Sequence, residues 1–559
     1  MSTDFIPTLV EHDRLILSSK LPFEVYQGAS SISPQIFAAN TQTGSSHTYT
    51  VTVPSYESIT DMNILWDGDI VFTITGTPAV GEYLVNLGNT TAGQNSDCLA
   101  PFPFLNALLV LAATVNQSQC SVNAQDVLLG LLPCISRETL SEYNSMTPTM
   151  LDNTQSYSQA NAVYPSSVFK TYSDSNNYKI QPRGSWYVKS MITPSTGLNG
   201  NILGVAPGPN ASRTVTVTVH VTEPLGILSP FLFAKSGGAG ISGVQAINFN
   251  MTLDQSGSRS WRSTSALQTV TMGYSNSQLL VTFLSPKASQ LVKYSARNIL
   301  PFSQLQVYKS NSQPAGPAGS VQKINTPSIQ LSSIPKMALL FVRPVNRSYN
   351  TADYVLPIVQ INCNFNGRNG ILSGATQQQL YAMSCDSGVQ QSWQEWSGVA
   401  GTAFAATTAL GVTTGAPTSI FTTGGILALT FSKHLECSAE YDSVSSIGQF
   451  NLAFNVSYSN DCGSAGNVEL YLVLVNEGIF ATERGQSSTY TSILSKSDVM
   501  SVINDVPLSD VPNSQTLPID GSEVLTGGRR RAGRGISGGG QSGGGRSAGA
   551  MKKLNSYLM

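Results

Sequence analysis

The chain has 559 residues and a formal net charge of −2, and only 11% of its residues are charged. This length exceeds the roughly 250–300 residues at which a single core stops growing, so it predicts at least two domains. Its seven widely spaced cysteines include no C-x-x-C pair and its longest apolar run is residues 101–115, which argues against a disulfide framework, a cysteine zinc site and a membrane-spanning helix.

In chain order, residues 1–44 are predicted to form an N-terminal arm. The arm holds Pro7, Pro22 and Pro34, and its early acidic residues and lack of a continuous apolar run do not fit a secretory signal. Two interpretations stay open: the arm extends along a neighbouring subunit, or it is a frayed terminus.

Alternating Thr and Val residues predict strands at 45–55, 69–78 and 213–223, with a turn at Asp67-Gly68 between the first two. A short helix is predicted at 123–132, with Asn123 as its N-cap. These elements define a first β domain over residues 45–227.

A Gly- and Pro-rich break at 228–240 is interpreted as a linker. A second β domain is predicted over 241–480, with a helix at 375–384. The strands of this domain are predicted at 243–253, 278–284, 335–344, 356–365, 425–432, 450–459 and 468–476. Residues 481–526 are predicted to be a helical segment, with a helix over 488–503.

Residues 107–132 and 356–384 share one order: an apolar strand, a polar turn, a short stretch and a helix. This similarity suggests an internal duplication. Antiparallel strands, long loops and few short helices predict an all-β fold of two consecutive jelly-roll or β-sandwich domains.

The C-terminal segment 527–559 is rich in glycine and carries no acidic residue. The rest of the chain holds 23 basic and 32 acidic residues, so the charge is segregated. The tail is predicted to be disordered, because glycine and serine cannot bury enough apolar surface to offset the entropy of ordering. Its basic residues are predicted to bind nucleic acid phosphates, and they are Arg529, Arg530, Arg531, Arg534, Arg546, Lys552 and Lys553. The arginine cluster also suggests nuclear import, and a solvated tail is the remaining interpretation.

No catalytic or metal site is predicted, and no cofactor. The histidines His12, His47, His220 and His434 show no metal-ligand spacing, and His220 inside a strand favours a structural role. Asp67 and Asp69 are explained by turn chemistry better than by a cation site. The G-x-S-x-G matches in the tail lack the strand and helix that a nucleophile elbow needs, so the chain is not predicted to be an enzyme.

Three stretches of sequence together resemble the double jelly-roll major capsid proteins, the class that includes the adenovirus hexon and the capsid proteins of virophages and polinton-like viruses. The first is "TYTVTVPSYESITDMNILWDGDIVFTITG" (48–76), the second "TEPLGILSPFLF" (222–233) and the third "SIPKMALLFVRP" (333–344) followed by residues 356–384. The resemblance covers about residues 45–480. It implies a virion protein that self-assembles, as a trimer or larger homo-oligomer, into an icosahedral shell around the genome, with a host receptor as a further possible partner.

Two alternatives stay open. The first is a capsid protein of a small RNA or single-stranded DNA virus, with one jelly-roll shell domain and a projecting β domain. The second is a secreted β-sandwich adhesin or lectin. Six N-x-[ST] sequons, which are N-glycosylation sites in secreted proteins, favour this alternative.

Overall fold

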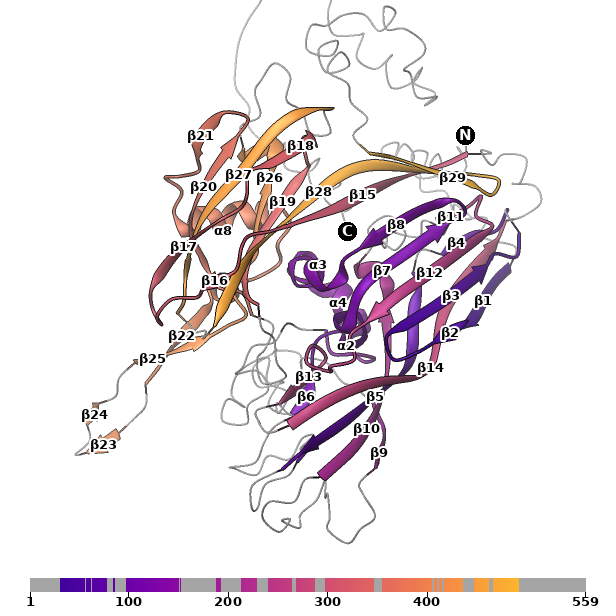
Figure 1. Ribbon diagram of the computed structural model, residues 1–559, viewed down its shortest axis with the longest axis horizontal. Coiled ribbons are helices and arrows are strands. Elements are labelled where there is room, and N and C mark those ends of the chain that lie inside the picture. Colours follow the sequence, from indigo (N-terminus) through magenta and orange to yellow (C-terminus); the bar gives the residue numbers. More distant parts are fainter. Residues whose placement is uncertain are drawn as a thin grey trace, which may run out of the picture.

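Figure 1 shows the computed structural model of the chain. The structure describes residues 31–491 except 56, 62, 78–83, 86–96, 150, 152–186, 193–212, 229–239, 264–267, 287–296, 346–353, 405–406, 410–411, 415–416, 436–446 and 462–465. Two β-sandwiches lie next to each other, the first in violet and magenta and the second in orange (Figure 1).

The first sandwich consists of two antiparallel sheets. One sheet has the order β11 (Gly240–Ile241), β4 (Ile59–Asp61), β14 (Gln268–Ser285), β5 (Leu65–Gly76), β10 (Arg213–Pro224) and β9 (Tyr187–Ile192), and β1 (Ser31–Ala38) also pairs with β14. The other has the order β2 (Thr41–Gln42), β3 (Ser46–Thr52), β12 (Ala246–Leu253), β7 (Leu108–Val115) and β8 (Ser118–Val122). A small ribbon joins β6 (Asp97–Leu99) to β13 (Trp261–Ser263).

The second sandwich repeats this order. Its first sheet is β15 (Arg297–Lys309), β28 (Asn467–Glu483), β19 (Met337–Pro344) and β26 (Leu427–Thr430), and β16 (Gln313–Pro314) and β29 (Gln486–Thr491) also pair with β28. Its second sheet is β17 (Val321–Asn325), β27 (Ile447–Ser459), β20 (Ile358–Phe365) and β21 (Arg368–Ile371), with β18 (Ile329–Ser333) also on β27. Two further ribbons pair β22 (Val399–Phe404) with β25 (Pro417–Phe421) and β23 (Thr407–Ala409) with β24 (Val412–Thr414).

The four-strand orders β1-β14-β5-β10 and β15-β28-β19-β26 are equivalent, because in each the first strand pairs with a long strand near the end of its domain, β14 or β28. The opposite sheets, β3-β12-β7-β8 and β17-β27-β20-β21, also correspond. Both domains are therefore jelly rolls. This confirms the predicted all-β fold of two jelly rolls and excludes a projecting domain of a different kind.

Helices are short and lie between strands. They are α2 (Pro103–Ala107), α3 (Ala124–Leu131), α4 (Arg137–Tyr143), α8 (Gln377–Asp386), α9 (Trp393–Trp396) and α10 (Phe431–His434), with 3-10 turns at Leu132–Cys134 and Leu225–Ile227. α3 follows the β7–β8 hairpin and α8 follows the β20–β21 hairpin, so the two repeated sequence segments form equivalent units. Asn123 precedes α3 as predicted, but its side chain makes no cap hydrogen bond. α8 begins with a capping box between Thr376 and Gln379.

The alternation of apolar and polar residues along each strand determines which side chains form the core. In β10, the side chains of Val215, Val217, Val219 and Val221 are buried, while the threonines between them lie on the other face. Trp66 of β5 stacks on Phe104 of α2 with ring centroids 3.6 Å apart. Branched and aromatic side chains of one parity thus fill the space between the sheets.

The predicted boundary at 228–240 is wrong. β12 pairs with β3 and β7, and β14 pairs with β5 and β1, so both strands belong to the first jelly roll. The Gly- and Pro-rich break is a connection inside that domain. The division of the chain falls between the end of β14 at Ser285 and the start of β15 at Arg297.

Four other predictions need correction or lie outside the described residues. The described part of the arm, from Ser31, forms β1 in the first sandwich. Residues 486–491 form strand β29, so the helix predicted over 488–503 is wrong at its start, and residues 492–503 are outside the described residues. Asp67 and Gly68 lie inside β5 and form no turn. The tail 527–559 and its seven basic residues are also outside the described residues.

Candidate functional site

The joint between the two jelly rolls contains a buried ion cluster. Asp126 of α3 forms ion pairs with Lys309 of β15 at 2.8 Å and with Arg343 of β19 at 3.4 Å. Arg343 also donates to the Gln125 carbonyl at 3.0 Å, and its guanidinium lies 4.0 Å from the centre of the Tyr471 ring. The Asp126 and Arg343 side chains are almost completely buried, so each charge depends on the other domain for compensation.

Apolar packing surrounds this cluster. Phe341 stacks on Tyr471 with ring centroids 5.3 Å apart. A Cβ atom added at Gly130 of α3 would lie 2.9 Å from the Phe341 ring, so the helix backbone directly approaches β19. β19 is consequently buried on both faces: Leu340 and Val342 lie in the core of the second jelly roll, and Phe341 and Arg343 face the first.

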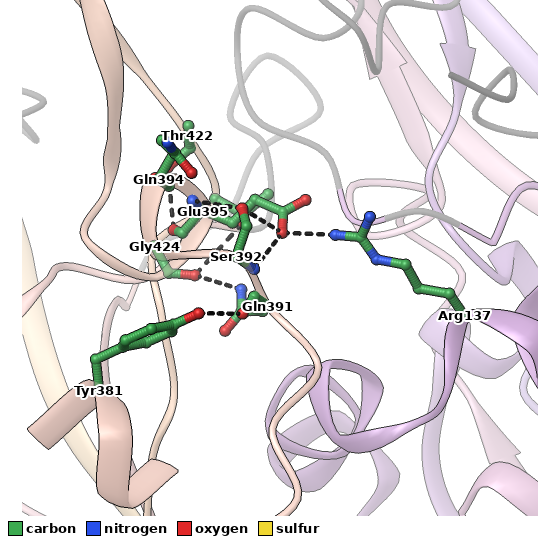
Figure 2. A network of polar contacts seen from close by, with 9 residues as sticks. Arg137, Tyr381, Gln391, Ser392, Gln394, Glu395, Thr422 and Gly424 are labelled. Carbon is green, nitrogen blue, oxygen red and sulfur yellow. Dashed lines mark hydrogen bonds and ion pairs between the residues drawn. The ribbon is translucent and has the colours of Figure 1, made fainter. Parts of the chain in front are cut away.

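A second contact links α4 to α9 (Figure 2). Arg137 donates to Glu395 Oε2 at 2.8 Å, and the same oxygen accepts hydrogen bonds from the backbone N–H and the hydroxyl of Ser392 at 2.8 and 3.0 Å. The capping box of α9 thus fixes the carboxylate that Arg137 reaches. Nearby, the backbone N–H of Gln390 donates to the Pro133 carbonyl at 2.7 Å.

A third contact comes from the β28–β29 hairpin, which extends over the first jelly roll (Figure 1). The Ser487 hydroxyl donates to the Val115 carbonyl at 2.6 Å and accepts from the N–H groups of Gln117 and Ser118 at 3.2 and 2.9 Å. The N–H of Gly485 donates to the Gly243 carbonyl at 3.0 Å. Three separate contacts therefore hold the jelly rolls in one relative orientation.

Strand register gives the molecule two distinct ends. Ser31 pairs with Ser285, and Arg297 pairs with Glu483. The hydroxyl of Thr482 donates to the Ser242 carbonyl, which places these positions of both domains at one end. We call it the terminal end, because both ends of the described chain lead to it. Residues 1–30 precede Ser31, and the chain continues beyond Thr491, the last residue of β29, which pairs with Gly478.

The opposite end, which we call the insertion end, joins two long connections of the first jelly roll. Gly76, Arg213 and Gln268 are paired there, and residues 77–96 and 193–212 begin or end at these positions. In the second jelly roll the β22–β25 ribbon projects toward the same end (Figure 1).

Asp67 and Asp69 belong to a polar network on the outward face of β5. Asp69 accepts hydrogen bonds from Lys189 and Asn276, both at 2.7 Å, and contacts His220 Nδ1 at 2.9 Å. Burial alone would raise the pKa of Asp69, but these three hydrogen bonds hold it below its ordinary value. The network is satisfied by protein groups, and its position inside the sheet supports the structural role predicted for His220.

In the part of the chain that the structure describes, no group of three or more His, Cys, Asp or Glu residues has the geometry of a metal site. Within the same residues, no helix is long and apolar enough to cross a membrane. Sequence reasoning missed the ion cluster at Asp126. The only sequence feature that pointed to a buried ion pair was Arg343, a charged residue near the end of the otherwise apolar strand at 337–344.

Two family models match this chain. The model described as the first domain of the Sputnik virophage major capsid protein matches residues 3–294, and that described as the C-terminal domain of major capsid protein V20 matches residues 304–478. The two matches meet at residues 295–303, close to the division that strand pairing defines between Ser285 and Arg297.

Among curated sequences, a putative capsid protein V20 of Sputnik virophage is 24% identical over 531 residues, covering 89% of this chain and 82% of the relative. A solved structure of the Sputnik virophage superposes with a TM-score of 0.70 at 20% identity, covering 90% of this chain and 96% of that one. The mavirus major capsid protein superposes with a TM-score of 0.61 at 11% identity, covering 86% and 94%. These structural similarities show a common fold.

Proposed function

This chain belongs to the Sputnik virophage major capsid protein family, and we propose that its copies self-associate, as trimers or larger rings, into an icosahedral shell that encloses the viral genome. The family is one of structural capsid proteins and not of enzymes. The observation that carries the proposal is the match of family models to both jelly rolls, together with a rigid joint between them. A fixed orientation of two jelly rolls gives each copy a defined shape for repeated packing.

The two ends of the molecule support an orientation in the shell. The basic residues of the tail follow β29, which lies toward the terminal end. The terminal end then faces the interior, and the seven tail cations, from Arg529 to Lys553, contact the genome. Arginine pairs with phosphate oxygens without requiring a particular base sequence. The same arginine cluster serves nuclear import before assembly.

The insertion end then faces outward. Its connections vary most easily without disturbing the sheets, because surface loops tolerate change. A host receptor would meet this end first.

The proposal is tested by expressing the full chain and a variant that lacks residues 527–559. Negative-stain electron microscopy of each shows whether closed particles or rings form, and the ratio of absorbance at 260 and 280 nm reports bound nucleic acid. We expect rings or shells from both proteins, and a raised ratio only with the full chain. Monomers at high concentration in both samples would contradict the shell, and an equal ratio would contradict the role of the tail.

A further inference from the structure

A hairpin projects from the second jelly roll at the insertion end. β22 pairs with β25, and farther out β23 pairs with β24. The outer part, β23 and β24, lies clear of both sandwiches (Figure 1). We call residues 399–421 the projecting hairpin. A strand rises about 3.4 Å per residue, so the hairpin reaches roughly 35 Å from its base, far enough to meet another molecule.

The base of the hairpin is held by the second jelly roll. The N–H of Thr422 donates to the Gly398 carbonyl at 3.0 Å. The Thr422 hydroxyl lies 2.9 and 3.0 Å from the carbonyl oxygens of Gln394 and Glu395, to which it donates (Figure 2). A Cβ atom added at Gly398 would lie 2.4 Å from Pro357, so the backbone packs tightly there. The base therefore fixes the direction in which the hairpin leaves the domain.

The projecting hairpin carries no charge. Residues 396–432 contain no Asp, Glu, Lys or Arg, and fifteen of the 23 residues of the hairpin are alanine, threonine or glycine. Alanine and glycine are depleted in strands, and a lone two-stranded hairpin is at best marginally stable in water. The hairpin therefore needs a partner to stabilise its strands.

Both edges of the hairpin are open. Within the described residues, β22 and β25 form a two-stranded sheet, and so do β23 and β24. Along each outer edge, every second residue presents a backbone N–H and C=O that no further strand pairs. Proteins usually block such edges with charged residues or proline, and here only Pro417 does so, at the outer end of β25. The edges are thus suited to pairing with another chain.

We propose that the projecting hairpins of neighbouring copies pair edge to edge, β22 of one copy with β25 of the next. The partner is a second copy, because ring symmetry brings its hairpin to the same height with the same uncharged edges. β22 runs outward and β25 runs back, so the pairing is antiparallel, as it is within the hairpin. Repeated around a ring, it leaves no open edge, as in a closed barrel. The inference rests on the proposed shell function and adds a contact on the outer surface.

Cysteine cross-linking tests the contact directly. Thr402 and Ser419 lie opposite each other within one hairpin, so the proposed pairing places Thr402 of one copy beside Ser419 of the next. Thr402→Cys and Ser419→Cys are made as separate chains, co-expressed and treated with a short bismaleimide. We expect covalent dimers from the co-expressed pair and only background from either variant alone.

Two controls measure that background. The wild type has seven cysteines, so its cross-linking shows what the native thiols contribute. Val321→Cys places a thiol on β17, where Val321 is 56% exposed, away from the projecting hairpin. Its cross-linking shows how often an exposed thiol reacts through random collision.

A shortened chain tests what the contact contributes. Asn-Gly replaces residues 400–420 and forms a turn between Val399 and its partner Phe421. The base is kept, so the fold should persist, which thermal unfolding checks. Sedimentation over a concentration series gives the dissociation constant of the ring. We expect it to rise at least about tenfold, because each copy loses one contact with its neighbour.

The other outcomes overturn the paired hairpins. A wild type that forms rings, with no more cross-linking in the co-expressed pair than in either variant alone, would leave the shell intact and exclude the contact. Equal cross-linking in T402C alone would exclude the head-to-tail pairing. If the hairpin packs on its own chain, shortening would lower the unfolding temperature without weakening the ring. A wild type that never associates would overturn the shell as well.

Discussion

Glu223 is a completely buried carboxyl group in the first jelly roll. Its oxygens accept hydrogen bonds from the backbone N–H groups of Leu105 and Phe104 at 2.8 and 3.0 Å and from the Thr147 hydroxyl at 3.2 Å. Burial raises the pKa of Glu223 to about 7, against the effect of these hydrogen bonds. The group therefore titrates near neutral pH.

This raised pKa predicts a pH-dependent stability. The folded chain keeps a proton on Glu223 up to about pH 7, whereas the unfolded chain releases it near the ordinary value of 4.5. The contribution of Glu223 to the free energy of unfolding is fully present below pH 4.5. It is lost as the pH rises to about 7, which lowers the free energy of unfolding by about 3 kcal/mol. Denaturant unfolding at pH 5 and pH 8 should show this loss in the wild type and not in Glu223→Gln. Equal pH dependence of the two proteins would contradict the assignment.

The ion cluster of the joint gives a second prediction at the residue scale. Asp126→Asn leaves Arg343 buried without its carboxylate, so we expect the free energy of unfolding to fall by about 3–5 kcal/mol. The matched control is Glu395→Gln, which removes the solvent-exposed ion pair to Arg137 and keeps a capping side chain. Glu395→Gln should lower the free energy of unfolding by less than about 1 kcal/mol. Denaturant unfolding compares the two, and equal losses would mean that burial does not set the strength of the joint.

At the scale of elements, α3 is the part that fixes one jelly roll against the other. Gly130 lowers the intrinsic helix propensity of α3 by about 1 kcal/mol relative to alanine, but it allows the close approach to Phe341. The sequence predicted this helix from its pattern of apolar residues. It gave no indication that one side of the helix contacts a strand more than 200 residues later in the chain.

We therefore expect Gly130→Ala to destabilise the protein by about 1–3 kcal/mol, although it improves helix propensity. The added Cβ atom must displace Phe341, which is stacked on Tyr471. Adding Phe341→Leu should recover part of the loss. Gly273→Ala is the control, because a Cβ atom there meets nothing within 4 Å. Thermal unfolding measures all three variants, and a stabilised G130A would contradict the close contact.

At the scale of the whole molecule, charge and fold are separated along the chain. The jelly rolls form the body, while the basic cluster follows the last described strand. Binding through such a tail depends on counterion release and not on a shaped site. The body and the tail should therefore contribute independently, the first to association of copies and the second to contact with nucleic acid.

Deleting 527–559 should remove most salt-dependent binding to single-stranded nucleic acid. Seven cations predict a slope of about −5 in a plot of log affinity against log salt concentration. The slope is measured by fluorescence anisotropy with the full chain and the deletion variant. The control replaces the seven basic residues by glutamine at unchanged length, and it should behave as the deletion does. A slope that survives in both variants would place the binding surface on the body.

The sequence by itself determined the β class, the position of most strands, the two repeated segments of strand, turn and helix, and the segregated charge. These properties depend on local alternation and composition, which a single sequence displays directly. The domain boundary needed the tertiary structure, because β12 and β14 are separated from their partners β3 and β5 by about 200 residues, and a Gly- and Pro-rich loop looks the same inside a domain as between domains.

The joint between the jelly rolls and the place of the N-terminal strand were also decided only by the tertiary structure. Asp126 and Arg343 meet across two domains, and residues 31–38 join the first jelly roll only through their pairing with β14. In sequence, residues 31–38 lie in the segment that was predicted to be an N-terminal arm. Which face of a strand is buried depends on what packs against the sheet, and that information lies in distant parts of the chain.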